Sequence, residues 1–133
     1  PAVGCNFDPS HLFWQGIDPL LAIKELGRAG TIVHVHAKDL RIDPANAALN
    51  GVLETTPYTN VLDRGWSFRT VGYGHGAVFW RDMVSALRAI GYDSVMSIEH
   101  EDPLASIDEG LAKAVELLSG VILTEEPAEP WWA

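Results

Sequence analysis

The sequence predicts an α/β fold in which short parallel strands alternate with helices. Three runs with the period-two alternation of strands follow one another along the 133 residues, and each precedes a segment of helical spacing. A helix between two strands supplies the right-handed crossover that makes the strands parallel. The composition, with 47% hydrophobic and 20% charged residues, is that of a globular protein.

The first unit begins with a strand that ends in a carboxylate. Alternation places Asn6 and Asp8 on the same strand face. Asp18 and Pro19 then supply an N-cap and a first helical position, and apolar residues recur at helical spacing after them. We expect Gly27 to stop this helix.

The second unit carries two imidazoles on one strand face. A strand over residues 31–36 points His34 and His36 the same way. Residues 40–76 contain several Gly and Pro residues and read as one long irregular loop, of the kind that usually serves as a functional lid or is disordered. Helical spacing resumes over residues 79–90.

The third unit again places a carboxylate near a strand end. The strand over residues 94–100 carries Glu99, and Ser106 with Glu109 forms the capping-box pattern at the start of the last helix. Residues 125–133 read as an acidic, proline-containing tail, whose two tryptophans either dock on the body or stay exposed.

Three parallel strands alone make a poor sheet, because both edges stay open for pairing. A complete TIM (β/α)₈ barrel takes ~250 residues, so residues 1–124 are expected to form part of such a barrel. The chain starts at Pro1 without Met, which favours a truncated or processed product. We therefore expect either pairing with a second copy or completion by a missing N-terminal barrel half.

Charge and cysteine content exclude several classes of protein. Nine basic against eighteen acidic residues give a formal charge of −9, which disfavours nucleic acid and anionic membrane as partners. No apolar run approaches the ~20 residues of a membrane span. The single cysteine, Cys5, cannot form an intrachain disulfide. These features favour a cytoplasmic setting.

Strand ends predict a shared site. In parallel neighbours Asp8, His36 and Glu99 lie at the carboxyl ends, where α/β barrels build active sites, and His11 follows Asp8 by three residues. Carboxylates with imidazole suit Mn²⁺, Mg²⁺, Co²⁺ or Zn²⁺. The predicted cofactor is therefore a divalent metal.

Each of these residues also has an ordinary structural interpretation. Asp8 before a proline can cap a turn. His36, and still more His34 deeper on the strand, can be hydrogen-bonded barrel histidines. Glu99 is harder to explain this way, because a buried glutamate needs a partner or a metal.

Four short motifs in unbroken order carry a family resemblance, which runs from about Val3 to Leu118. The sequence resembles the sugar phosphate isomerase/epimerase family, which has the xylose-isomerase-like TIM barrel and is related to AP-endonuclease type 2 enzymes. The motifs are Asn6-Phe7-Asp8-Pro9-Ser10-His11, His34-Val35-His36-Ala37-Lys38-Asp39, Arg69-Thr70-Val71-Gly72-Tyr73-Gly74 and Ser97-Ile98-Glu99-His100-Glu101-Asp102.

The resemblance implies that these are strands six, seven and eight, which makes the chain the three C-terminal units of a barrel. It implies one metal on Asp8, His36 and Glu99, with His11 contacting metal or substrate. An arginine of the long loop would contact substrate oxygens, and Arg69 is the better match, with Arg64 second. The family's strand-five glutamate has no counterpart in this chain.

Those residues would serve proton transfer beside a carbonyl. A divalent ion polarises the carbonyl oxygen and stabilises an enediolate, while Glu99 acts as ligand and general base. Lys38 and His11 would hold hydroxyls or an oxyanion, with a surface cation as the alternative for Lys38. Trp14 would stack on a sugar, with core packing as its alternative.

The leading hypothesis is a metal-dependent sugar, sugar phosphate or polyol isomerase or epimerase, or a dehydratase-like enzyme, with a small-molecule substrate. The alternative enzyme is an AP-endonuclease-type phosphodiesterase, which would want a basic DNA surface that the negative charge disfavours. The alternative outside catalysis is an inactive barrel fragment.

Overall fold

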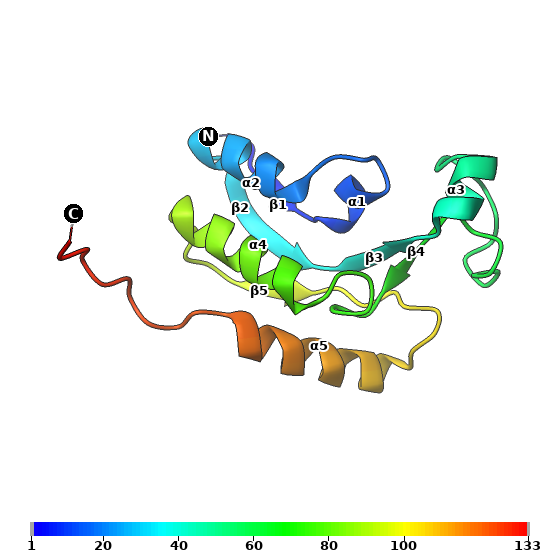
Figure 1. Ribbon diagram of the computed structural model, residues 1–133. Helices are drawn as coiled ribbons and strands as arrows, with labels where there is room; N and C mark the ends of the chain where they lie inside the picture. Colours follow the sequence, from blue (N-terminus) through cyan, green and yellow to red (C-terminus); the bar gives the residue numbers. More distant parts are fainter. Residues whose placement is uncertain (1, 133) are drawn as a thin grey trace.

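The computed structural model describes residues 2–132, so that Pro1 and Ala133, the outer limits of the predicted barrel segment and tail, lie outside the described residues. Its elements, shown in Figure 1, follow the order β1 (Cys5–Phe7), α1 (Ser10–Phe13), α2 (Pro19–Arg28), β2 (Ile32–Ala37), β3 (Asp39–Ile42), α3 (Pro44–Asn50), β4 (Trp66–Arg69), α4 (Ala77–Ala89), β5 (Met96–Ile98) and α5 (Ile107–Val121).

The predicted parallel strands are confirmed. β2 lies between β1 and β5 and pairs with both in parallel. The register sets Phe7 opposite Val35, and Val35 in turn opposite Met96. Asp8 comes directly after β1 and Glu99 directly after β5, so both carboxylates leave the sheet at the same end.

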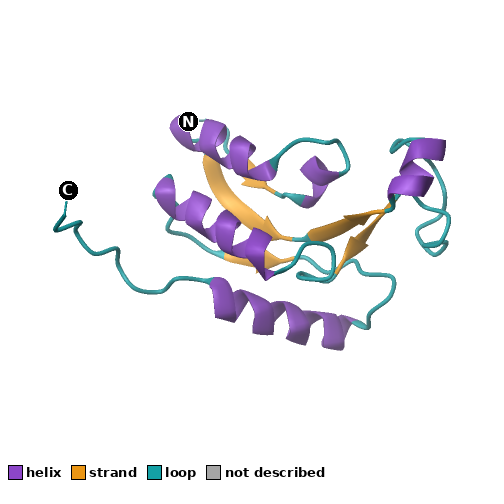
Figure 2. Cartoon of the chain, viewed as in Figure 1, coloured by secondary structure: helices purple, strands orange, loops and turns teal. Residues whose placement is uncertain are grey.

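Helices α2, α4 and α5 pack on one face of this sheet, as Figure 2 shows. Val35 and Ala37 of β2 are fully buried there against a core that includes Ile23 of α2, Trp80 of α4 and Leu118 of α5. Burying a large apolar side chain contributes roughly 1.5–3 kcal/mol, so this face holds the units together. The opposite face carries the polar residues of the strands.

The interpretation of residues 40–76 as one irregular loop was wrong. β3 continues from β2 after one residue and pairs antiparallel with β4, with Leu40 opposite Phe68. Each strand has four residues and its partner lies far away in sequence, so neither produces a long alternating pattern. Pro44 is the first residue of α3, whose N-cap Asp43 accepts hydrogen bonds from two backbone N–H groups.

The expectation that Gly27 ends a helix was also wrong. α2 runs through Arg28, and a Cβ at Gly27 would overlap the side chain of Ile90, at the end of α4. Glycine here permits close helix packing. The chain turns instead at Gly30, whose φ of 63° is a conformation that glycine adopts readily.

The predicted N-caps of α2 and α5 are present, and the tail stays exposed. Asp18 caps α2, and the Ser106 hydroxyl accepts from the Glu109 N–H at the start of α5. Trp131 and Trp132 are 89% and 72% exposed and do not dock, and Figure 1 shows the tail running away from the helices. No helix within residues 2–132 has both the length and the apolar character to cross a bilayer.

Candidate metal centre

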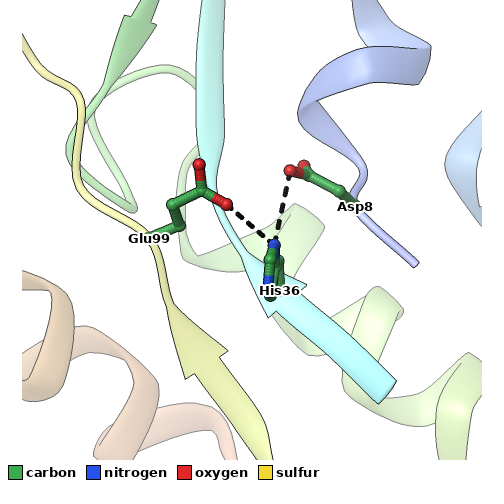
Figure 3. Close-up of side chains that lie close together, drawn as sticks. All are labelled: Asp8, His36 and Glu99. Atoms are coloured by element: carbon green, nitrogen blue, oxygen red, sulfur yellow. Dashed lines mark ion pairs between the residues drawn. The ribbon is translucent and has the colours of Figure 1, made fainter. Parts of the chain in front are cut away.

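Three side chains from neighbouring strand ends converge (Figure 3). Asp8, His36 and Glu99 each offer a ligand atom, and these atoms all lie within 4.8 Å of one another. His36 Nδ1 is 2.8 Å from Glu99 Oε2 and 3.8 Å from Asp8 Oδ2. The structure thus brings together the three predicted ligands.

The backbone of the central strand explains why His36 faces this cluster. His34 and His36 point to the polar face of β2, opposite the buried Val35. His34 Nε2 lies 2.9 Å from Ser97 Oγ. His34 is thus a hydrogen-bonded histidine of the strand, as its ordinary structural interpretation predicted. Asn6 Nδ2 lies 3.2 Å from His36 Nε2, so Nδ1 is the nitrogen turned to the carboxylates.

Asp8 is oriented by the turn that follows it. Its Oδ1 accepts hydrogen bonds from the Ser10 backbone N–H at 2.9 Å and the Ser10 hydroxyl at 2.7 Å. Its Oδ2 faces His36 and also lies 3.6 Å from His11 Nε2. Asp8 therefore caps a turn with one oxygen and contributes to the cluster with the other, and His11 stands at the edge of the site.

Lys38 is a buried member of the site, so the surface-cation alternative was wrong. Its side chain is 3% exposed, and Nζ lies 2.7 Å from Glu99 Oε1 and 2.6 Å from Glu101 Oε2. Burial acts to lower the pKa of Lys38, but the hydrogen bonds to Glu101 and Glu99 outweigh it, so this pKa is raised.

Glu99 is held as a carboxylate. The hydrogen bond from Lys38 lowers the pKa of Glu99 against the opposing effect of burial, and the charges of Lys38, His36 and His11 lower it further. The ionised form is the one that binds a cation or accepts a proton.

The two arginines singled out from the sequence have other partners. Arg69 Nε contacts Asp102 Oδ1 at 3.2 Å, and Arg69 lines a small cavity of about 100 Å³ beside α5. Arg64 is buried, donates to the carbonyl of Trp66 at 2.9 Å and also to that of Thr56, and so ties the loop before β4. Substrate contact by Arg69 stays a prediction.

Trp14 belongs to a second apolar cluster around β3 and β4. Its ring stacks on Trp66 with centroids 5.6 Å apart, and its Nε1 is buried without a hydrogen-bond partner within residues 2–132. Phe68 of the same cluster lies nearer Asp8, His36 and Glu99. Its ring and that of His11 form a T-shaped pair with centroids 5.9 Å apart, and Lys38 Nζ lies 4.0 Å from its centroid. In the structure Trp14 packs against this apolar cluster, and its stacking on a sugar remains a prediction.

Sequence reasoning missed two buried carboxylates that organise the loops beside the site. Asp39 Oδ2 accepts from the backbone N–H groups of Gly72, Gly74 and His75 at 2.9–3.0 Å. Its Oδ1 accepts from the Leu40 N–H at 2.8 Å and contacts His75 Nδ1 at 2.8 Å. The available signal was an aspartate two residues after the end of β2, at the carboxyl end of the sheet.

Asp102 is the second of these carboxylates. It accepts from the N–H groups of Thr70 at 2.7 Å and Leu104 at 2.8 Å, and it pairs with Arg69. Burial acts to raise the pKa of Asp102, but the hydrogen bonds from Thr70 and Leu104 outweigh it and the pKa is lowered. Glu101 was missed as well; it follows β5, and like Glu99 it contacts the ammonium of Lys38.

Comparisons with known proteins identify the family of the fold. A family model described as "Xylose isomerase-like TIM barrel" matches residues 1–119. "Uncharacterized protein YfiH" of Bacillus subtilis (strain 168) is 43% identical over 122 residues, which are 92% of this chain and 38% of YfiH. The crystal structure of a xylose isomerase domain protein from Planctomyces limnophilus matches with a TM-score of 0.63 and 28% identity, over 91% of this chain and 38% of that one. The chain thus spans 38% of the length of each relative.

Proposed function

Because the chain belongs to the xylose isomerase-like TIM barrel family, which includes sugar isomerases and epimerases as well as AP-endonuclease-like enzymes, we propose that its barrel is a divalent-metal-dependent isomerase or epimerase of a sugar, sugar phosphate or polyol. The observation that carries this proposal is the convergence of Asp8, His36 and Glu99 at the carboxyl ends of adjacent parallel strands. The proposal applies to the closed barrel, in which further strands pair with β1 and β5.

The donor set fits a divalent cation. Two carboxylate oxygens and one imidazole nitrogen within 4.8 Å are hard to intermediate ligands, suited to Mn²⁺, Mg²⁺, Co²⁺ or Zn²⁺. Asp8, His36 and Glu99 would hold this ion, with His11 at the edge of the site. When bound, it supplies a positive charge that polarises the substrate carbonyl and stabilises the negative charge that develops on its oxygen.

The protein's own groups account for orientation and proton transfer. The ionised Glu99 accepts the proton from the carbon beside the carbonyl. His11 stands beside Asp8 and against Phe68, where it can hold a substrate hydroxyl. Asn6 keeps His36 Nδ1 turned toward the carboxylates through its contact with Nε2.

Charge at the site favours a sugar or polyol over DNA. Glu99 and Glu101 contact the buried ammonium of Lys38, and Asp8 lies in the ligand cluster with Glu99, so the site holds three carboxylates. The whole chain carries a formal charge of −9, whereas DNA binding calls for many cationic contacts to phosphates. Phosphodiester cleavage is therefore the less supported activity of the family.

The experiment follows solvent deuterium into the carbon beside the carbonyl of candidate ketoses, using the complete barrel protein with and without Mn²⁺. We expect exchange that requires the metal. Glu99→Gln keeps the size of the side chain but removes its charge, so exchange should fall by about 10²–10⁴-fold, the usual contribution of a general base. His36→Ala should mainly weaken Mn²⁺ binding, which calorimetry measures directly.

The matched control is Glu116→Gln, which removes an exposed carboxylate of α5 paired with Lys113. This variant should bind Mn²⁺ and exchange deuterium like the unchanged protein. Exchange that is independent of metal, or that survives Glu99→Gln, would exclude the proposed mechanism. Metal-dependent cleavage of abasic DNA without sugar exchange would favour the phosphodiesterase instead.

A further inference from the structure

Lys38 and Glu101 extend the metal centre by one step along each strand. Lys38 follows His36 by two residues and Glu101 follows Glu99 by two, and the contacts of Lys38 with both glutamates place these side chains beside the ligand cluster. The Glu99 N–H donates to the Ala37 carbonyl at 3.1 Å, which carries the β2–β5 register past the last residue of β5. The lysine and the two glutamates therefore face each other across neighbouring strands.

The ammonium of Lys38 is fixed on several sides. It contacts Glu99 Oε1 at 2.7 Å and Glu101 Oε2 at 2.6 Å, and it lies 4.0 Å from the centre of the Phe68 ring. An ammonium has three N–H donors, of which the two carboxylates take two. With the third beside an aromatic ring and 3% of the side chain exposed, little of Lys38 is left to bind a substrate.

The two oxygens of Glu99 consequently have different surroundings. Oε2 lies 2.8 Å from His36 Nδ1, inside the cluster of ligand atoms, whereas Oε1 is bonded to Lys38. A divalent cation and an ammonium repel each other, so an ion bound between Asp8, His36 and Glu99 has no access to Oε1 while Lys38 holds it. The two oxygens of Asp8 also have different partners: Oδ1 accepts from Ser10, and Oδ2 lies in the cluster of ligand atoms.

We propose that Lys38 is a positioning residue that keeps Glu99 Oε1 out of the metal's coordination, so that Glu99 binds the ion through Oε2 alone. This inference rests on the proposed function. A carboxylate oxygen has a second lone pair, so Oε1 can still accept a proton after bonding to Lys38. Without Lys38, Glu99 can bind the metal with both oxygens. Oε1, the oxygen that accepts the proton, is then occupied by the metal.

The test replaces Lys38 in the complete barrel protein and reads the coordination of Co²⁺ by visible absorption at saturating metal. Lys38→Met keeps a side chain of similar length without the ammonium. The added Glu99 oxygen should raise the coordination number and weaken the visible bands. Deuterium exchange should fall by about 10–100-fold, as expected for a residue that orients a metal ligand. Lys38→Arg, which retains a cationic donor, should keep much of the Co²⁺ absorption and of the deuterium exchange.

Glu116→Gln is the matched control, because it removes an exposed carboxylate of α5, paired with Lys113, that lies outside the site. Its Co²⁺ spectrum should match that of the unchanged protein. A Lys38→Met variant that folds and shows the unchanged spectrum overturns the positioning role but leaves the proposed function standing. An unchanged protein that binds no Co²⁺ overturns both.

A second measurement does not depend on whether Lys38→Met folds. The infrared difference spectrum on adding Mn²⁺, with the Glu99→Gln spectrum subtracted, reports how that one carboxylate binds. One-oxygen binding widens the gap between the antisymmetric and symmetric carboxylate stretches, and this is the expected result. A narrowed gap would mean that both oxygens bind the metal, and the inference would fail.

Discussion

Replacing Asp39 by Asn should destabilise the loop between β4 and α4 far more than the loss of one surface charge. Asp39 is fully buried, and its two oxygens receive four backbone N–H groups and face the ring of His75. An asparagine offers only one oxygen. If that oxygen keeps Gly72, Gly74 and His75, the NH₂ group of the amide must face the N–H of Leu40.

The magnitude follows from this arrangement. A buried N–H of Leu40 left without an acceptor costs about 1–3 kcal/mol. The three remaining hydrogen bonds lose the charge of their acceptor, which makes each roughly half as strong. Hydrogen bonds to a charged group contribute about 1.5–3 kcal/mol each, so together these terms predict a loss of about 3–7 kcal/mol in Asp39→Asn. Phe13 of α1 stacks on His75 with centroids 3.8 Å apart, so the loosened loop should also release the helix that carries His11.

Amide hydrogen exchange in the complete barrel protein measures the effect where it arises. Exchange at Gly72, Gly74 and His75 should accelerate by about 100-fold or more, because each 1.4 kcal/mol corresponds to a factor of ten. The matched control is Asp43→Asn, since Asp43 is an exposed N-cap and asparagine caps helices about as well as aspartate. Equal protection of the loop in the two variants would refute the role assigned to Asp39.

Three further predictions concern α5 and its neighbours. Gly110→Ala places a methyl group where the ring of His100 lies and should cost about 1–3 kcal/mol in thermal unfolding, whereas Gly120→Ala, with open space around it, should be neutral or stabilising. The lowered pKa of Asp102 means that its contribution to stability is present above about pH 4 and is lost as the pH falls through the folded-state pKa. Asp102→Asn should therefore flatten the acid limb of the melting-temperature profile, and a profile of unchanged slope would count against this account. Ser106→Ala removes the hydroxyl that caps α5 and should cost about 1 kcal/mol in urea unfolding, a loss that Ser106→Asp should largely avoid.

The site could be predicted from sequence where it depends on strand periodicity. Asp8, His36 and Glu99 stand at the ends of short strands, and the parallel order of those strands brings them together. The four motifs that resemble the family contain the same three residues. Local pattern and chain order were sufficient because each ligand lies within a residue of a strand end.

The remaining features depend on contacts between distant segments. Pairing of β3 with β4 joins residues 39–42 to 66–69 across a helix and a loop, and neither four-residue strand has a distinctive pattern of its own. The partners of Lys38 lie more than sixty positions away, so burial of its ammonium was not visible in its neighbours. Gly27 was predicted to end a helix, because the reason for a glycine there, close packing against Ile90 at the end of α4, is not visible in the local sequence.

The hairpin of β3 and β4 carries, beyond its closed base, a segment with several exposed apolar side chains. It is closed near its base by the pairing of Asp39 with Arg69, and farther out the Asp43 N–H donates to the Gly65 carbonyl at 2.9 Å. Beyond that closure, α3 buries none of its residues, and Leu49, Leu53 and Leu62 are more than 80% exposed. The exposed side chains of this segment can therefore change without disturbing Asp8, His36 and Glu99. Arg64, which is buried and donates to the carbonyls of Thr56 and Trp66, limits which replacements of the whole segment keep β4 in place.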